Sequence, residues 1–287
     1  MGGVAPISNT EPSSHCPITI MNPLKWIKGR YISRIANQAV ERLKSQELIG
    51  TIDPANFADS LRDPNTYYRR AFQDFHRLVP AELRAHRAYF QIDRRGFGED
   101  AFHTMWWRLV REFRPGNFLE IGVYRGQVVS LITLLSKLER LHCEVTGISP
   151  FSSAGDSVSI YRKDLNYLKD TLEHFKHHGL PEPTLINAYS TDPEALQVIA
   201  SRRWDMIYID GNHDYDVVIK DWEACANSVK PGGIIILDDS GLSTAYQPPP
   251  FSTAGHPGPS RLASEIDPKR FKEILQVGHN RVFQHIS

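Results

Sequence analysis

The chain has 287 residues, and its 33 Lys and Arg residues are balanced by 33 Asp and Glu residues. This balance gives no general electrostatic reason to expect nucleic acid or an anionic membrane as a partner. No apolar run approaches the roughly 20 residues of a membrane span, and the amino terminus lacks the basic and then apolar pattern of a signal peptide. The cysteines, Cys16, Cys143 and Cys225, have no disulfide or metal-site spacing, so we expect a cytoplasmic protein.

The amino-terminal third differs in composition from the rest of the chain. Residues 1–20 are rich in Ser, Pro, Gly and Thr without periodicity, which predicts a disordered tail. Residues 21–100 have a helical pattern with breaks near Asp53-Pro54 and Asp63-Pro64. We expect a helical accessory region that packs on the core or on another subunit of a homo-oligomer. Its basic and aromatic residues leave a partner surface as the alternative.

Residues 101–287 alternate between helical and strand patterns, which predicts one further domain. The expected strands are residues 117–121, 144–148 and 184–188, and the expected helices are residues 101–113, 127–141, 161–178 and 192–201. Such alternation is typical of a doubly wound, mostly parallel α/β sheet. The end of the chain predicts an antiparallel hairpin, with strands at 271–278 and 281–286.

The stretch of residues 204–240 contains a strand, a helix and a second strand. Its two apolar runs, MIYI and IIIL, end in Asp210 and in Asp238-Asp239. The length of the crossover between them implies a parallel pair, and ligands of open parallel sheets bind beyond the carboxyl ends of the strands. We therefore predict that these acids meet at one edge of the sheet and mark the active site. The Pro-, Ser- and Gly-rich residues 241–260 come directly after the second strand, and we expect them to form a lid loop.

A glycine turn comes after the first strand, in the sequence LEIGVYRG. Gly122 and Gly126 allow a tight turn from strand to helix and a close approach of the backbone to a ligand. Amide groups at the start of that helix suit an anionic part of the ligand, Glu120 suits an amine, and Tyr124 is expected to line the pocket. The motif lacks both G-x-G-x-x-G spacing and a P-loop lysine, which disfavours a dinucleotide or a nucleoside triphosphate. A tight turn without a ligand is the alternative.

Three carboxylates carry the second motif. Asp210, Asp238 and Asp239 are hard oxygen ligands suited to a divalent ion such as Mg²⁺. His213 comes after Asp210 on the same loop, and an imidazole can take a proton from a hydroxyl beside a metal ion. Asp210 is the alternative proton acceptor. Turn and strand-end roles are the alternatives for the acids, and a helix cap is the alternative for His213. Two further residues are expected to be solvated: Asp221, on a helix surface, and His256, in a loop.

The order Glu-x-Gly-x-x-x-Gly, IDGNHDY and PGGIIILDDS resembles the motifs of class I S-adenosylmethionine-dependent methyltransferases. The match covers about residues 101–287 and is closest to the metal-dependent sugar O-methyltransferases of the macrocin and mycinamicin types. The resemblance implies a Rossmann-like methyltransferase fold, S-adenosylmethionine as cofactor, and a sugar or glycosylated metabolite as the small molecule methylated on a hydroxyl. It also implies that Asp210, Asp238 and Asp239 bind the metal ion and that His213 is the base.

Two serines stand where this family binds the cofactor. The second strand of the family usually ends in an acid that bonds the ribose hydroxyls, and Ser149 takes that position here. A serine bonds a hydroxyl more weakly than a charged acceptor, and Asp156 in the loop after that strand is the candidate to compensate. Ser190 falls where the family contacts the adenosine side. A catechol-type methyltransferase is the alternative enzyme, and a cofactor-binding scaffold or regulatory protein without transfer activity is the alternative outside enzymes.

Overall fold

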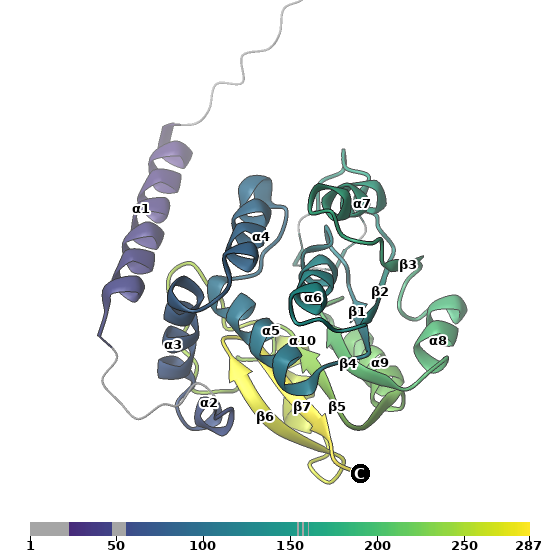
Figure 1. The fold of residues 1–287 in the computed structure, drawn as a ribbon. Helices are drawn as coiled ribbons and strands as arrows, with labels where there is room; N and C mark the ends of the chain where they lie inside the picture. The colour runs from purple at the N-terminus through teal and green to yellow at the C-terminus, as the bar shows by residue number, and fades with distance from the viewer. Residues whose placement is uncertain (1–22, 48–55, 154, 157, 160) are drawn as a thin grey trace, which may run out of the picture.

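The computed structural model describes residues 23–47, 56–153, 155–156, 158–159 and 161–287, with side chains from residue 33 onward. The predicted disordered tail, residues 1–20, lies outside this part of the chain. Within it, seven strands form one sheet that is packed between helices (Figure 1). None of the described helices is long and apolar enough to cross a membrane.

The strands lie in the order β3-β2-β1-β4-β5-β7-β6. Their bounds are β1 Asn117–Ile121, β2 Glu144–Ser149, β3 Thr184–Asn187, β4 Trp204–Ile209, β5 Val229–Leu237, β6 Phe271–Val277 and β7 Asn280–His285. Strands β1 to β5 pair in parallel, whereas β7 runs antiparallel to both β5 and β6. The predicted doubly wound, mostly parallel sheet and the predicted terminal hairpin are therefore confirmed.

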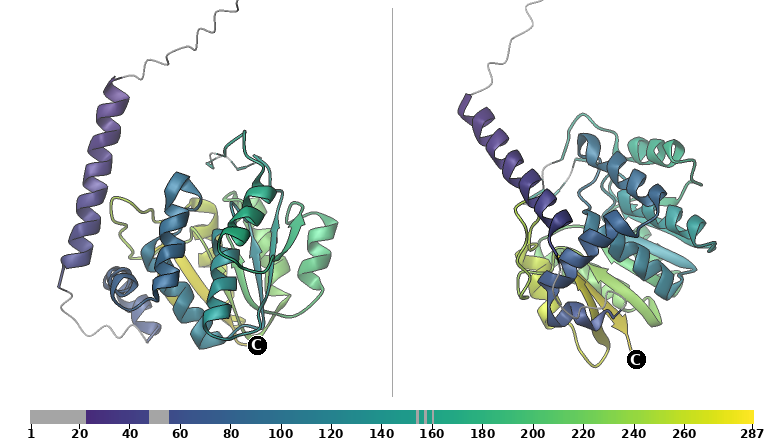
Figure 2. Two further views of the ribbon diagram at one scale, coloured as in Figure 1. Left: turned by 45° about the horizontal axis from the view of Figure 1, so that its top comes forward. Right: turned by 60° about the vertical axis from the view of Figure 1, so that its left-hand side comes forward.

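Helices cover both faces of the sheet (Figure 2). Successive side chains of a strand point to opposite faces, and in β1 Phe118 packs in one apolar layer while Leu119 and Ile121 pack in the other. One face is covered by α3 Pro64–Arg77, α4 Ala81–Gln91, α5 Asp100–Phe113, α6 Gln127–Leu138 and α7 Tyr167–His177. The other face is covered by α8 Pro193–Ala200, α9 Tyr215–Ala226 and α10 Pro257–Glu265.

The amino-terminal helices extend the core of the sheet. Helix α1, Pro23–Ser45, lies along one side of the molecule (Figure 1), and α2 is Ala58–Arg62. Helix α3 begins where the Asp63 carboxylate accepts a hydrogen bond from the Thr66 backbone N–H at 3.0 Å. Tyr67 and Tyr68 of this helix are each 1% exposed and belong to the same apolar layer as α5 and α6.

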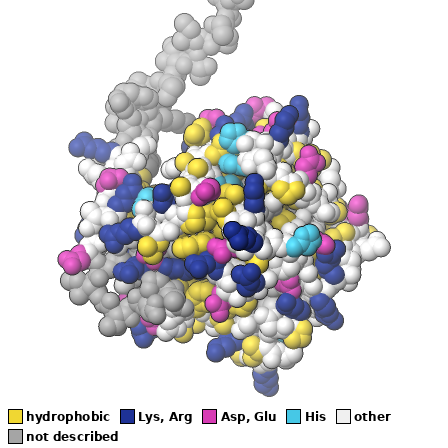
Figure 3. All heavy atoms as spheres, viewed as in Figure 1, with side chains coloured by type: hydrophobic (Ala, Val, Ile, Leu, Met, Phe, Trp, Pro, Cys, Tyr) yellow, Lys and Arg dark blue, Asp and Glu magenta, His cyan; other side chains and the backbone are white. Residues whose placement is uncertain are grey.

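Lys and Arg side chains gather over α3 and α5 on the face shown in Figure 3. Several of these cations pair with acids of the same face. Arg108 contacts Asp74, and Arg111 Nε lies 3.6 Å from Glu139 Oε1. Because neighbouring acids pair with these cations, the cluster attracts anions less strongly than its number of Lys and Arg side chains suggests.

The segment after β5 differs from the predicted lid loop at residues 241–260. The loop ends at His256, because α10 begins with Pro257, and proline is favoured in the first turn of a helix. Within the loop, Tyr246 is buried with its ring 5.3 Å from that of Tyr68. The prediction of a continuous loop is thus wrong from Pro257 onward, and a lid role for the remaining loop stays a prediction.

Two buried histidines join α4 to α5 and α6. His86 Nδ1 lies 3.3 Å from His103 Nε2, and His86 Nε2 lies 2.9 Å from the Ser130 hydroxyl oxygen. Burial lowers the pKa of His103 to about 3. Burial, together with the charge of a protonated His103, also lowers the pKa of His86 well below its usual range. Both rings therefore stay neutral in the folded protein in mildly acidic solution.

Stability is expected to fall as the pH decreases below about 6.5, the ordinary pKa of histidine. Below that pH the unfolded chain binds a proton at each of these histidines and the folded protein does not. The free energy of unfolding should therefore decrease by up to about 1.4 kcal/mol per pH unit for each histidine. Urea unfolding at several pH values measures this slope. His103→Leu should make it shallower, whereas His142→Asn, at an exposed histidine, should not; an unchanged slope in His103→Leu would contradict the prediction.

Candidate active site

The carboxyl ends of four parallel strands form one row. The register pairs Ile121 of β1 with Ile148 of β2 and with Ile209 of β4, and it pairs Ile209 with Leu237 of β5. The next residues along the chain are therefore neighbours along one edge of the sheet: Gly122, Ser149, Asp210 and Asp238. The structure thus brings the predicted acids beside the predicted glycine turn.

Asp210, Asp238 and Asp239 form an acid cluster at this edge. Burial raises the pKa of Asp210 well above its usual range, and the charges of Asp238 and Asp239 raise it further. Burial also raises the pKa of Asp238. The Tyr208 hydroxyl donates a hydrogen bond to Asp210 Oδ2 at 3.1 Å. Carboxylates that repel one another in a desolvated place favour a bound cation, so this donor set fits a divalent ion.

His213 lies between two carboxylates. Asp156 accepts hydrogen bonds from the His213 backbone N–H, at 2.9 Å, and from its Nδ1–H, while His213 Nε2 lies 2.7 Å from Asp239 Oδ2. Burial by itself lowers the pKa of His213, but the hydrogen bond and charge of Asp239, together with Asp156, raise it to about 9. Asp156 thus directs the imidazole toward the acid cluster. This contact argues against the role expected for Asp156, a substitute for the ribose-binding acid.

Two further histidines reach the acid cluster from outside the predicted motifs. His279, in the turn between β6 and β7, has Nε2 3.3 Å from Asp238 Oδ1. His256 has Nε2 3.7 Å from Asp239 Oδ2, so it is not merely the solvated loop histidine that the sequence predicts. The predicted hairpin could have indicated His279 as a further site residue, because the turn of an antiparallel hairpin beside β5 lies at the carboxyl edge of the sheet.

The glycine turn serves the packing of the protein itself. Gly122 has a φ of 98°, and a Cβ there would lie 1.9 Å from the backbone oxygen of Asp210. The neighbouring strand end, and not only a ligand, therefore excludes a side chain. Gly126 has a φ of 80°, and a Cβ there would lie 2.6 Å from Thr171 Cγ2. Both glycines are required by the turn, and their approach to a cofactor stays a prediction.

Glu120 is buried beside the glycine turn. It is 3% exposed, and its Oε2 atom has no hydrogen-bond partner among the described residues. Burial raises the pKa of Glu120 to about 8, and the charge of Asp238 contributes to the rise. A ligand with a cationic amine would provide the missing donor and favour the ionised carboxylate, so this position fits the role predicted for it.

The remaining predicted cofactor residues lie around the same edge. The Tyr124 ring lies 5.8 Å from the Tyr161 ring, Ser149 ends β2, and Ser190 comes shortly after β3. Ser190 lies beside Asp221 of α9. Asp221 is only 2% exposed, so the prediction of a surface charge is wrong, because α9 turns this position toward the sheet.

Residues 119–240 match the model of a family described as a methyltransferase domain. Two solved structures are similar to most of the chain. The methyltransferase PaMTH1 of Podospora anserina, with bound SAH, is 16% identical with a TM-score of 0.54, covering 83% of this chain and 100% of that one. A putative caffeoyl-CoA O-methyltransferase from Staphylococcus aureus is 14% identical with a TM-score of 0.54, covering 76% and 98%. The chain has the fold of a class I methyltransferase.

A relative of this chain by sequence is the uncharacterized protein R132 of Acanthamoeba polyphaga mimivirus. It is 25% identical over 157 residues, or 54% of this chain, and the match spans 62% of the length of that relative. The predicted site residues, from Glu120 to Asp239, all lie within the matched methyltransferase domain at residues 119–240. His256 and His279 lie beyond it.

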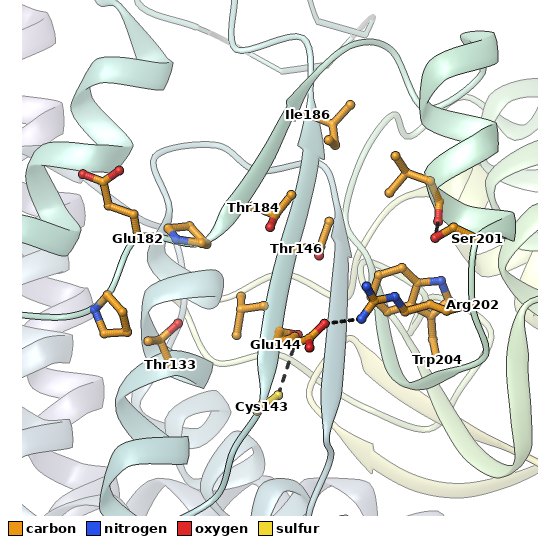
Figure 4. Close-up of a pocket in the computed structure, with 14 residues that line it drawn as sticks. Thr133, Cys143, Glu144, Thr146, Glu182, Thr184, Ile186, Ser201, Arg202 and Trp204 are labelled. Atoms are coloured by element: carbon orange, nitrogen blue, oxygen red, sulfur yellow. Dashed lines mark hydrogen bonds and ion pairs between the residues drawn. The ribbon is translucent and has the colours of Figure 1, made fainter.

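A groove of about 450 Å³ lies at the opposite end of the methyltransferase sheet (Figure 4). Its lining includes Glu144, Thr184 and Trp204, the residues that begin β2, β3 and β4. Arg202, which also lines the groove, pairs with Glu144. Because ligands of parallel sheets bind at the carboxyl ends of the strands, this groove at the amino ends is not the candidate active site.

Proposed function

We propose that this protein transfers a methyl group from S-adenosylmethionine to a hydroxyl of a small molecule, with a divalent cation at the acid cluster. One observation carries the proposal: in a methyltransferase fold, the acid cluster and His213 lie at the carboxyl edge of the sheet, next to the glycine turn of β1. Carboxylates with an adjacent imidazole suit the activation of a hydroxyl. Carboxylate ligands alone suit hard ions such as Mg²⁺.

Residues around the glycine turn would hold the cofactor. Glu120 offers its unpartnered carboxyl oxygen to the amine, and Tyr124 borders the turn. Ser149 and Ser190, at the next two strand ends, are proposed for the ribose and the adenosine side. The cofactor supplies a methyl group that is already activated on a sulfonium. The residues therefore have to position the two reactants, and positioning supplies much of the rate.

The acid cluster and His213 would prepare the acceptor hydroxyl. A divalent cation held by Asp210, Asp238 and Asp239 would supply positive charge that favours loss of the hydroxyl proton. We assign removal of that proton to His213 Nε2, because Asp156 holds the opposite side of the ring and directs Nε2 to the edge. Asp210 is the second candidate for the proton acceptor.

The acceptor is proposed to be a sugar or a glycosylated metabolite. The motifs IDGNHDY and PGGIIILDDS, which resemble those of metal-dependent sugar O-methyltransferases, support this choice. Neighbouring sugar hydroxyls would also present two oxygens to one cation. A catechol is the second candidate, since one structure with a similar fold belongs to a putative caffeoyl-CoA O-methyltransferase. A cytoplasmic location and a homo-oligomer stay predictions.

Incubation with methyl-labelled S-adenosylmethionine and a panel of glycosides and catechols tests the proposal. We expect label in glycosides, loss of transfer when EDTA is added, and recovery with excess divalent cation. Transfer to catechols alone would show that the acceptor is a catechol and not a sugar or glycosylated metabolite. Transfer that EDTA leaves unchanged would contradict a role for the cation. Binding of S-adenosylhomocysteine without transfer to any acceptor would favour a cofactor-binding scaffold.

A further inference from the structure

We infer that the divalent ion at the acid cluster is a transition-metal ion with His279 as a further ligand, so that an imidazole nitrogen joins the carboxylates of Asp238 and Asp239. The role of the ion in methyl transfer rests on the proposed function, whereas the site itself is inferred from the position of His279. Asp210, which shares a hydrogen bond with Asp238, keeps the place in the acid cluster that the proposed function gives it.

His279 is held in one orientation by its surroundings. It is 7% exposed, and its ring lies 4.8 Å from the Phe102 ring in an edge-on arrangement. Its Nδ1 lies 2.9 Å from the backbone oxygen of Thr253, in the loop after β5. A carbonyl oxygen only accepts hydrogen bonds, so Nδ1 carries the proton. Metal-binding histidines commonly donate their second ring N–H to a backbone carbonyl in this way.

The other ring nitrogen of His279 faces the acid cluster. This nitrogen, Nε2, lies 3.3 Å from Asp238 Oδ1 and 3.9 Å from Asp239 Oδ1, and it is the ring atom that would bind an ion held by these carboxylates. Asp238 Oδ1 is buried and has no hydrogen-bond partner among the described residues. Three electron-pair donors thus converge within 4.8 Å of one another, an arrangement suited to a shared cation.

A second group of residues at this edge has similar spacing, but its histidine has closer carboxylate partners. His213, Asp239 and His256 also place their ligand atoms within 4.8 Å of one another. However, both ring nitrogens of His213 face carboxylates at hydrogen-bond distance, those of Asp156 and Asp239. Both nitrogens of His213 thus already have close carboxylate partners, whereas Nε2 of His279 lies 3.3 Å from Asp238 Oδ1. This difference favours the group that contains His279.

The nitrogen ligand determines the class of ion. Mg²⁺ prefers a shell made entirely of oxygen atoms, whereas imidazole suits transition metals such as Zn²⁺, Fe²⁺ and Ni²⁺. Affinity for a mixed nitrogen and oxygen site also rises along the first-row series through Co²⁺. A site made of Asp238, Asp239 and His279 should therefore prefer Co²⁺, a convenient probe of this class, over Mg²⁺.

Calorimetric titration of the EDTA-treated, dialysed full-length protein with Co²⁺ and with Mg²⁺ tests the inference. The wild-type protein should bind Co²⁺ more tightly than Mg²⁺. His279→Asp, which exchanges the nitrogen ligand for a carboxylate, should lower the ratio of Co²⁺ to Mg²⁺ affinity by about tenfold or more. Retained Mg²⁺ binding in this variant would show that it is folded. His256→Asp, the same change at the other neighbouring histidine, should leave the ratio unchanged.

Several results would overturn the inference. An unchanged ratio of Co²⁺ to Mg²⁺ affinity in His279→Asp would exclude His279 as a ligand of the ion. A lowered ratio in His256→Asp would place the ion beside His213. Absence of metal binding by the wild-type protein would leave His279 as the partner of Asp238 in an ion pair. The titration needs neither methyl donor nor acceptor, so failure of the proposed methyl transfer does not affect it. Conversely, a transferase that binds and uses Mg²⁺ alone would refute the inference and preserve the function.

Discussion

Replacing His213 with alanine is expected to lower the turnover of methyl transfer by about 100-fold or more, the usual effect of removing a general base. The imidazole lies between Asp156 and Asp239, and its Nε2 points to the edge where the acceptor hydroxyl is expected. Glu120 and the glycine turn, which are proposed to hold the cofactor, are unchanged in this variant. Steady-state rates with labelled donor measure the loss, and calorimetry with S-adenosylhomocysteine should give nearly unchanged cofactor affinity.

His256→Ala is the matched control for this experiment. The His256 ring lies 4.3 Å from the His213 ring, but its side chain is 31% exposed and its Nε2 lies 3.7 Å from Asp239. Its removal should change turnover by only a few-fold. Near-normal turnover in His213→Ala would exclude His213 as the base and leave proton removal to Asp210.

Gly122→Ala is expected to lower the free energy of unfolding by about 2–6 kcal/mol, since two penalties of roughly 1–3 kcal/mol each combine. The first is the strain of a φ of 98° in a residue with a Cβ. The second is the collision of that Cβ with the Asp210 backbone oxygen, which would lie 1.9 Å away. Because that oxygen belongs to a central strand end, it cannot move without disturbing the acid cluster. Urea unfolding measures the change.

Gly232→Ala separates the two penalties. Gly232 also has a positive φ, of 78°, but a Cβ there would have no heavy atom within 4 Å. Its substitution should therefore lower the stability by the strain alone, about 1 kcal/mol. Equal losses of stability in the two variants would show that the contact with the Asp210 backbone oxygen adds no penalty at Gly122. A close approach to a ligand would then be the remaining reason for a glycine at this position.

The fold class and the acid cluster could be predicted because their signals are local. Asp210 and Asp238 each come directly after an apolar run, and the helix between those runs has the length of a parallel crossover. Parallel strands that are joined in this way end at the same edge of the sheet, so both acids had to lie on that edge. The same reasoning predicted the place of the glycine turn. That β4 and β5 are direct neighbours at this edge was decided by the order of the strands in the whole sheet.

Other features could be misread because the deciding contact lies outside the local sequence. Asp221 has the polarity of a surface residue, yet the packing of α9 on the sheet buries it. The Pro-rich composition of residues 241–260 predicts a loop, yet Pro257 starts α10, which packs on α9. Gly122 is needed for a turn, as predicted, but the carbonyl that excludes its side chain comes from another strand.

By itself, the sequence determined the doubly wound sheet and the carboxylates at its edge, since both depend on apolar periodicity and on the residues placed directly after each strand. Only the tertiary structure decided which groups face those carboxylates. His279 lies beside the carboxylates because β7 pairs antiparallel with β5, and Asp156 contacts His213 from the loop after β2. Pairings between segments so far apart leave no local pattern, because they depend on register and packing across the whole sheet.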